Sequence, residues 1–438
     1  MKLIYFGILI VLPLGYFSLI DDSFSLFGQE PKLQDPNLGI EIVSSGLNFP
    51  SDMAFLDAND ILVLEKNTGI VKRIVNGSAL NDPILDLAVS NKDERGLLGI
   101  TIQRNESREV HVFLYYTESA GHKDGEDTTE NREPLGNRLY RYTLVDNKLV
   151  DPKLLVDISA STTAKNAFHN GGKISIGPDN YVYLSVGNME RNTKALNNKT
   201  GLQPDGSAGI LRLTQDGKIA NKKILGDAYP LNLYYAYGIR NSFGMDFDPV
   251  TGNLWITENG PTYGDEINLV QAGFNSGSKL IYGIFNDTRE NFQPKRLEYF
   301  NGTGKYSNPE FVWQEPVGPT ALKFLESSKL SSEYRNTMFV GDVNNGNLYN
   351  FRLDKERKEL LLQPPLSDQV ADNKTELQNI IFGNGFGGII DVEESPDGFL
   401  YVLAIKDFQH NEDGTIYRIF SKEKHQTIKN LNVKMTIK

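Results

Sequence analysis

Polar side chains stand at the start of three expected strands. The three stretches are Glu94-Arg95-Gly96 before LLGI, His169-Asn170 before GGKISI, and Arg240-Asn241 before SFGMDF. An imidazole that titrates near neutral pH can take a proton from a hydroxyl group, and a guanidinium can stabilise developing negative charge or hold a carboxylate. These residue types predict a general base at His169 and anion stabilisation at Arg240.

Each of these residues also has a structural interpretation. His169 would then be a polar residue bonded to the backbone, and Arg240 a channel-lining cation paired with an acid such as Glu94. Glu94 would be that structural acid or a ligand contact. The sequence alone leaves both interpretations open.

A loop rich in carbonyls and acids, ENGPTYGDEINLV, follows from Glu258 to Val270. Gly260 and Pro261 leave backbone oxygens free, and Asp265 and Glu266 add negative charge. Hard cations such as Ca²⁺ prefer oxygen ligands of this kind, so the loop is a candidate metal site. The alternative is an ordinary turn between two strands. The motifs GxSxG and HExxH and a glycine-rich phosphate loop are absent from the sequence, which argues against serine hydrolases, zinc peptidases and nucleotide enzymes.

One pattern recurs six times along the chain: an alternating strand, a turn rich in Pro, Asp, Asn or Gly, a second strand, and a third strand. The copies begin at Ser51, Leu97, Gly171, Ser242, Thr320 and Gly387. No copy could bury both of its faces alone, and repetition around an axis solves that problem. The pattern predicts an all-β fold, a six-bladed β-propeller of four-stranded antiparallel blades, with Gly39–Leu47 pairing into the last blade.

The propeller brings the polar strand starts together, because the first strand of each blade lines the central channel. The stretches at Glu94, His169 and Arg240 come from consecutive blades. We therefore expect them to meet at one mouth of the channel, where a small ligand would bind.

The chain has 438 residues, a formal net charge of −11 and no cysteine. The acidic charge argues against a nucleic-acid partner, which would need a basic face. The lack of cysteine excludes disulfides and thiol catalysis.

An apolar run from Leu3 to Ile20 lies between Lys2 and the pair Asp21-Asp22. It is long for a signal peptide and borderline for a membrane span, so residues 1–22 are expected to form a hydrophobic helix, either a cleaved signal or an N-terminal membrane anchor. The flanking charges place the rest of the chain outside the cytoplasm, secreted or anchored to the outer face of the cytoplasmic membrane. After this segment we expect a tether over 23–38, the propeller over 39–422 and a C-terminal tail over 423–438.

Longer motifs carry a family resemblance over about residues 40–420. They include GLLGI, FHNGGKISIGPDNYVYLSVGN, YGIRNSFGMDFDPVTGNLWITENGPTYGDEINLV, EPVGPTALKF and DVEESPDGFLYVLA. In this order they resemble the glucose/sorbosone dehydrogenase family, the soluble quinoprotein sugar dehydrogenases. The resemblance implies a propeller that binds pyrroloquinoline quinone (PQQ) and Ca²⁺ and oxidises an aldose at C1 to a lactone, with an external electron acceptor.

The resemblance also implies roles for single residues. His169 would be the general base on the C1 hydroxyl, and Arg240 would stabilise the reduced quinone oxygen. Asn241 would contact the cofactor, and Glu94 would be a polar residue at the pocket. The carbonyls of Gly260 and Pro261 would be ligands of Ca²⁺.

Three positions depart from the family pattern. The Arg-x-Arg pair that the family has in the last blade is replaced here by Gly388 and Ile390. The lysine that the family has in the fifth blade is replaced by Asn344, in the turn DVNNGN. PQQ has three carboxylates, and hydrogen bonds to charged groups contribute about 1.5–3 kcal/mol each. The alternative function is therefore a non-catalytic extracellular propeller that binds a carbohydrate or a protein partner and keeps calcium for structure.

Overall fold

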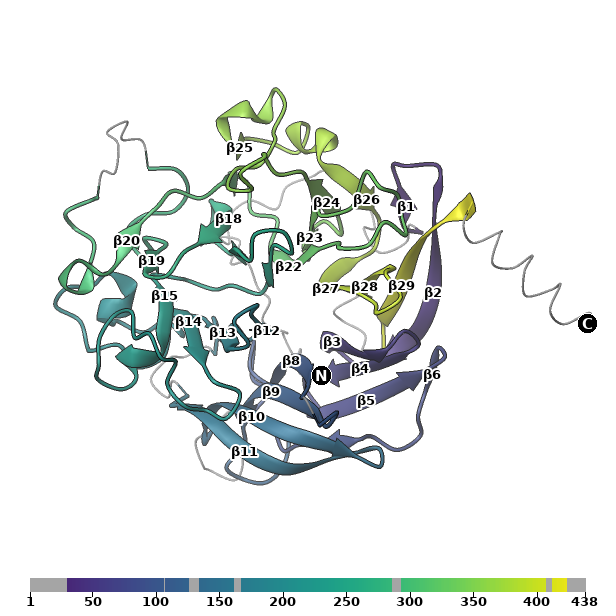
Figure 1. Ribbon diagram of the computed structural model, residues 1–438, viewed down its shortest axis with the longest axis horizontal. Coiled ribbons are helices and arrows are strands. Elements are labelled where there is room, and N and C mark those ends of the chain that lie inside the picture. The colour runs from purple at the N-terminus through teal and green to yellow at the C-terminus, as the bar shows by residue number, and fades with distance from the viewer. Residues whose placement is uncertain are drawn as a thin grey trace, which may run out of the picture.

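The computed structural model describes residues 30–105, 107–125, 134–160, 167–285, 293–406 and 412–423. Their strands form six small sheets, which Figure 1 shows arranged around a common centre. Neighbouring strands are antiparallel except for three short pairings, β15 with β19, β19 with β20, and β21 with β25. The predicted all-β propeller is confirmed.

Each sheet ends at the centre with one inner strand, and the other strands follow outward. The first two sheets are β3 (Pro50–Asp57), β4 (Asp60–Glu65), β5 (Ile70–Val75) and β6 (Ser78–Ala79) with β7 (Leu85–Asp86) beside β5, and then β8 (Leu97–Arg104), β9 (Val110–Glu118), β10 (Gly136–Val145) and β11 (Lys148–Ile158). The next two are β12 (Ile174–Ile176), β13 (Val182–Val186), β14 (Gly209–Leu213), β15 (Tyr234–Tyr237), β19 (Phe274–Asn275) and β20 (Lys305–Tyr306), and then β16 (Met245–Phe247), β17 (Leu254–Glu258), β18 (Asp265–Val270), β21 (Phe311–Trp313) and β25 (Val370–Ala371). The last two are β22 (Pro319–Phe324), β23 (Met338–Asp342), β24 (Leu348–Phe351), β26 (Ile381–Asn384) and β1 (Lys32–Leu33), and then β27 (Gly388–Glu394), β28 (Leu400–Ile405), β29 (Gly414–Ser421) and β2 (Leu38–Leu47).

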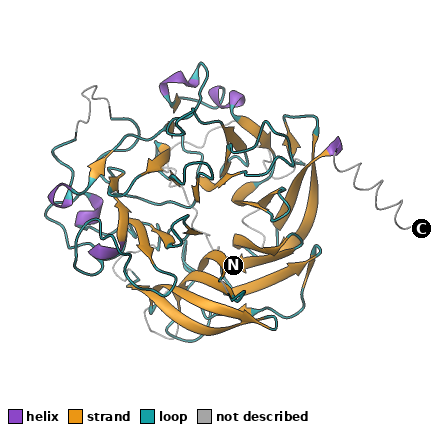
Figure 2. Ribbon diagram, in the orientation of Figure 1, coloured by secondary structure: helices purple, strands orange, loops and turns teal. Residues whose placement is uncertain are grey.

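The prediction of four strands in every sheet is wrong, because the sheets contain four to six strands. Connecting segments add short strands at the outer edges, and paired backbone at an edge removes exposed N–H and C=O groups. Helical structure among the named elements is limited to 3-10 turns, which Figure 2 shows toward the rim. They are η1 (Lys194–Leu196), η2 (Leu231–Leu233), η3 (Phe300–Gly302), η4 (Leu366–Asp368) and η5 (Glu376–Asn379).

The N-terminal strand closes the ring as the sequence predicts. β2 pairs antiparallel with β29 from Leu38 opposite Ser421 to Leu47 opposite Gly414. Within the segment expected to be a tether, β1 pairs with β26. The apolar run from Leu3 to Ile20 and most of the C-terminal tail lie outside the described residues. No helix within the described ranges has the length and apolar character needed to cross a membrane.

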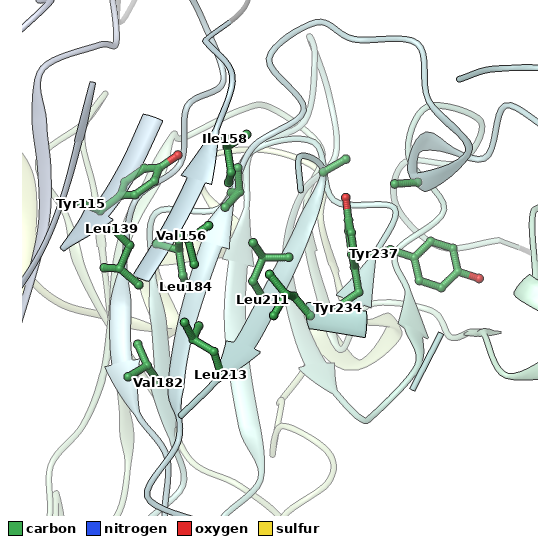
Figure 3. Close-up of a cluster of buried hydrophobic side chains, with 14 of the residues drawn as sticks. Tyr115, Leu139, Val156, Ile158, Val182, Leu184, Leu211, Leu213, Tyr234 and Tyr237 are labelled. Atoms are coloured by element: carbon green, nitrogen blue, oxygen red, sulfur yellow. The ribbon is translucent and has the colours of Figure 1, made fainter. Parts of the chain in front are cut away.

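Apolar side chains between neighbouring sheets form the core. Figure 3 shows one such cluster, in which β9, β10 and β11 of one sheet pack against β13, β14 and β15 of the next. Val182, Leu184 and Leu211 in this cluster are fully buried. Each such side chain contributes about 1.5–3 kcal/mol relative to its exposed state, so contact between sheets holds the inner strands in place.

A buried ion network joins the inner strands around the channel. The Lys173 ammonium lies 2.9 Å from Asp52, 2.7 Å from Asp391 and 3.1 Å from Glu393. Lys323 bridges from Glu393, at 3.1 Å, to Asp246, at 3.5 Å. These side chains come from the starts or interiors of inner strands in five different sheets, so the network fixes the sheets relative to one another.

Candidate active site

The His169 turn starts the third inner strand with an unusual backbone. His169 has a φ of 60° and Gly171 a φ of 66°, both in the left-handed region. A side chain at Gly171 would come within 2.8 Å of the Gly187 nitrogen, so the turn needs glycine there. The turn aims the His169 ring toward the next loop of the same sheet, at Asn188.

Glu94 brings the three polar strand starts together. Its Oε2 accepts hydrogen bonds from the main-chain N–H of His169 at 2.7 Å and of Asn170 at 3.3 Å, and from Asn241 Nδ2 at 3.1 Å. Asn241 in turn accepts the Gly171 N–H at 3.1 Å. The three segments expected to converge therefore lie in direct contact, with Glu94 as their common acceptor.

A hydrogen bond to Asn188 fixes the tautomer of His169. Asn188 Oδ1 accepts the Glu190 N–H at 2.8 Å and lies 2.8 Å from His169 Nδ1. The Glu190 N–H identifies this atom as the amide oxygen, which carries no hydrogen and can only accept, so the Nδ1 atom carries the proton and donates it to Asn188. Burial and the nearby Arg240 lower the pKa of His169 to about 4. At neutral pH His169 is uncharged, and its Nε2 lone pair is available to accept a proton.

Arg240 lies beside this base. Its main-chain N–H donates to Glu258 Oε1 at 2.6 Å, and its guanidinium donates to the Asn259 carbonyl at 2.8 Å. Its carbonyl accepts the N–H of Asn188, the residue that holds the His169 ring, at 2.8 Å. The salt bridge to Glu94 that the structural interpretation predicted is not formed in the described part of the chain, and only one of the guanidinium's five N–H donors has an acceptor there.

Lys66 braces the loop that carries Glu94. Its ammonium donates to the carbonyls of Asp93 at 2.9 Å and Arg95 at 2.6 Å, on either side of Glu94. Burial lowers the pKa of Lys66 to about 7 and raises the pKa of Glu94 to about 7. Sequence reasoning missed Lys66, because its strand pattern alone gives no sign that its side chain turns toward a loop of the next sheet.

The acidic side chains of the candidate metal loop accept hydrogen bonds from the protein. Asp265 Oδ1 accepts the Gly260 N–H at 2.8 Å, and Asp265 Oδ2 accepts two more N–H groups, from Val317 and Gly318. Glu266 accepts the Gly283 N–H and Asn268 Nδ2. Both carboxylates are therefore engaged with protein donors, and their role as metal ligands stays a prediction.

Main-chain and amide oxygens of the same loop remain available. The carbonyls of Gly260 and Pro261 accept no hydrogen bond from the described residues, and neither does the buried Oδ1 of Asn259. No group of three His, Cys, Asp or Glu side chains there could hold a metal ion. Neutral oxygens of this kind are the ligands that a hard cation such as Ca²⁺ prefers.

A central cavity reaches part of this site, while His169, Arg240 and Asn241 are not among the residues that line it. Its lining includes Glu94, Gly171, Asn259, Lys66 and Lys173, together with apolar side chains. Ile390 lines the wall where the resemblance places an arginine, and Asn344 donates instead to the Pro316 carbonyl at 3.4 Å. The cavity thus has no cation at the two positions where the resemblance places basic anchors, and Lys66 and Lys173 are the cations in its lining.

Comparison with known proteins gives the same picture. The family model for glucose/sorbosone dehydrogenase matches residues 47–424. The aldose sugar dehydrogenase of Escherichia coli is 25% identical over 370 residues, covering 84% of this chain and 90% of that protein. The quinoprotein glucose dehydrogenase B of Acinetobacter calcoaceticus is 23% identical over 390 residues, covering 74% and 80%.

Solved structures share the fold. The PQQ-bound aldose sugar dehydrogenase of Streptomyces coelicolor matches with a TM-score of 0.63 and 19% identity, covering 89% of this chain and all of that one. The apo form of the Escherichia coli enzyme matches with a TM-score of 0.66 and 21% identity, covering 88% and 100%. The chain belongs to the glucose/sorbosone dehydrogenase family.

Proposed function

We propose that this protein is an exported sugar dehydrogenase that oxidises an aldose at C1 to a lactone with PQQ and Ca²⁺, on a propeller whose six sheets are six blades. The observation that carries the proposal is the neutral His169, with Nδ1 bound to Asn188 and Nε2 unprotonated beside Arg240. The family membership supports sugar oxidation as the reaction class.

The geometry of His169 indicates how the proton of the sugar hydroxyl is removed. Its Nε2 accepts the proton of the C1 hydroxyl, while Asn188 keeps Nδ1 as the donor and holds the ring in place. Arg240 is close enough to disfavour charge on the free imidazole, so the resulting imidazolium returns its proton readily to water or acceptor.

The cofactor would be held at the mouth of the cavity. Arg240 and Asn241 would contact it, and the carbonyls of Gly260 and Pro261 would hold Ca²⁺. When bound, PQQ would supply the two-electron acceptor that sugar oxidation needs. An external acceptor would then take the electrons onward.

The test replaces the base without removing the fold. His169→Gln should lower aldose-dependent dye reduction by at least about 10²-fold at saturating PQQ and Ca²⁺, since general bases contribute about 10²–10⁴-fold. His111→Gln, on β9 and away from the cavity, is the matched control and should keep the wild-type rate. Equal rates in wild type and His169→Gln, with PQQ bound, would exclude His169 as the base.

One observation favours the alternative, a propeller that binds a carbohydrate or protein without catalysis. The cavity wall at Ile390 is apolar, and Asn344 is engaged with the backbone, so neither supplies charge to a tricarboxylate. A chain that binds no PQQ in the presence of Ca²⁺ but binds sugars would establish this second function.

A further inference from the structure

The side chain of Asn259 has an unexplained oxygen. Its Oδ1 is buried, and no donor reaches it among the described residues. A buried acceptor without a hydrogen bond costs about 1–3 kcal/mol, and such groups in folded proteins point to a missing water, ion or ligand. Asn259 also lines the central cavity, so the residue borders the space where a small ligand would lie.

The backbone of Asn259 is fixed from two sides. Its N–H donates to the Asn241 carbonyl at 2.8 Å, and its own carbonyl accepts the Arg240 guanidinium at 2.8 Å. Both partners belong to the strand start that forms the site. The amide of Asn259 is thus held against the candidate cofactor contacts, and a ligand would meet it in a set position.

The next two residues present further oxygens. The carbonyls of Gly260 and Pro261 accept no hydrogen bond within the described ranges. The Gly260 N–H is held by Asp265 at 2.8 Å, which fixes the peptide planes of the loop. Three consecutive residues therefore each carry one oxygen without a donor, and a hard cation is the ligand that requires several such oxygens at once.

Three buried acidic side chains lie near the loop. Glu258, Asp265 and Glu266 are buried, and their oxygens accept N–H or O–H groups of the protein. Glu258 and Glu266 stand opposite each other on β17 and β18. The Arg240 guanidinium also lies at this loop, on the Asn259 carbonyl, so the oxygens without donors, rather than net charge, carry the argument for a cation.

We propose that Asn259 is a further Ca²⁺ ligand, its side-chain oxygen joining the carbonyl oxygens of Gly260 and Pro261. This inference rests on the proposed function for its setting but makes a separate claim, that the Asn259 side chain contributes to Ca²⁺ affinity, which can be measured without the quinone. Waters complete the shell in the quinone-free state, since Ca²⁺ takes six to eight oxygens. A metal fixed in advance would offset part of the attraction lost at Asn344, Gly388 and Ile390.

Calcium titration of the full chain without PQQ tests the claim. We expect saturable binding of one Ca²⁺, with a Kd of about 10⁻⁴–10⁻³ M or tighter. Asn259→Leu, similar in size but without the oxygen, should weaken binding by at least about tenfold, because even indirect partners of metal ligands change affinity by 10–100-fold. Asn259→Asp should bind as tightly as wild type or more tightly, and Asn379→Leu on the exposed η5 should change nothing.

Matching far-UV spectra and melting temperatures without Ca²⁺ confirm that each variant is folded. A wild-type Kd in Asn259→Leu would overturn the proposal. So would the absence of saturable binding in the wild type. Sugar oxidation measured separately at saturating PQQ and Ca²⁺ separates the two claims. If the wild type oxidises sugar but Asn259→Leu has an unchanged Ca²⁺ Kd, only the claim that Asn259 is a ligand is refuted. If Ca²⁺ binding depends on Asn259 but the wild type does not oxidise sugar, only the dehydrogenase function is refuted.

Discussion

Replacing Lys173 by methionine would remove the centre of the axial ion network. The ammonium contacts three carboxylates at 2.7 to 3.1 Å, and its side chain is only 8% exposed. Methionine keeps most of the volume and apolar length of lysine. The substitution Lys173→Met therefore removes the charge and its hydrogen bonds with little change in packing.

The expected loss follows from the burial of the partners. Asp52 and Asp391 are each 3% exposed, so the variant leaves two buried carboxylates without their shared cation. Breaking a buried ion pair from one side costs about 3–5 kcal/mol, because the remaining charge stays desolvated. Hydrogen bonds from the Ile100 and Met53 N–H groups to these carboxylates keep the loss in that range rather than above it.

Denaturant unfolding at pH 8 and pH 5 measures the effect. Burial raises the pKa of Asp391 well above its usual range and Lys173 opposes that rise, so removing Lys173 lets this carboxylate take up a proton still more readily. The variant should lose about 3–5 kcal/mol at pH 8 and clearly less at pH 5, where protonation neutralises the buried charge. Lys153→Met is the control, since Lys153 and its partner Asp216 are about half exposed and such pairs contribute about 0–1 kcal/mol.

A loss below about 1 kcal/mol at pH 8 would refute the reasoning, because it would mean that water reaches the carboxylates and screens them. An equal loss at both pH values would refute the charge argument in a different way. It would assign the effect to packing of the lysine stem.

Two further predictions concern the site. The pKa of Glu94 is about 7 in the folded state against 4.5 in the unfolded state, so its contribution to stability is fully present below pH 4.5 and lost as the pH rises through 7. Between pH 4 and pH 8 the free energy of unfolding of Glu94→Gln should therefore rise by about 3 kcal/mol relative to that of wild type, as measured by denaturant unfolding. A difference between the two proteins that is independent of pH would contradict the raised pKa. Ile390→Arg puts a cation on the apolar cavity wall and should tighten PQQ binding about tenfold or more in a fluorescence titration, since a charged hydrogen bond contributes about 1.5–3 kcal/mol. Unchanged affinity would place the quinone away from that wall.

The sequence by itself determined the all-β propeller and the neighbours in the site. Strand alternation and the sixfold recurrence of one pattern depend on local residue order, so they predict the sheets and the pairing of β2 with β29. The same logic placed Glu94, His169 and Asn241 together, since each stands before an inner strand. The prediction of four strands in every sheet was wrong because short edge strands such as β25 carry almost no periodic signal in the sequence.

Only the tertiary structure decided how these residues are used. Asp265 is a candidate metal ligand by sequence, and only the structure shows that its oxygens accept the N–H groups of Gly260, Val317 and Gly318 from two separate loops. Lys173 reads as one more strand residue, yet it joins acids more than 100 positions away in the chain. The pKa of His169 and the uncovered oxygen of Asn259 depend on burial and on partners from other sheets. Burial and long-range contact are set when the sheets pack around the axis, and no local pattern encodes them.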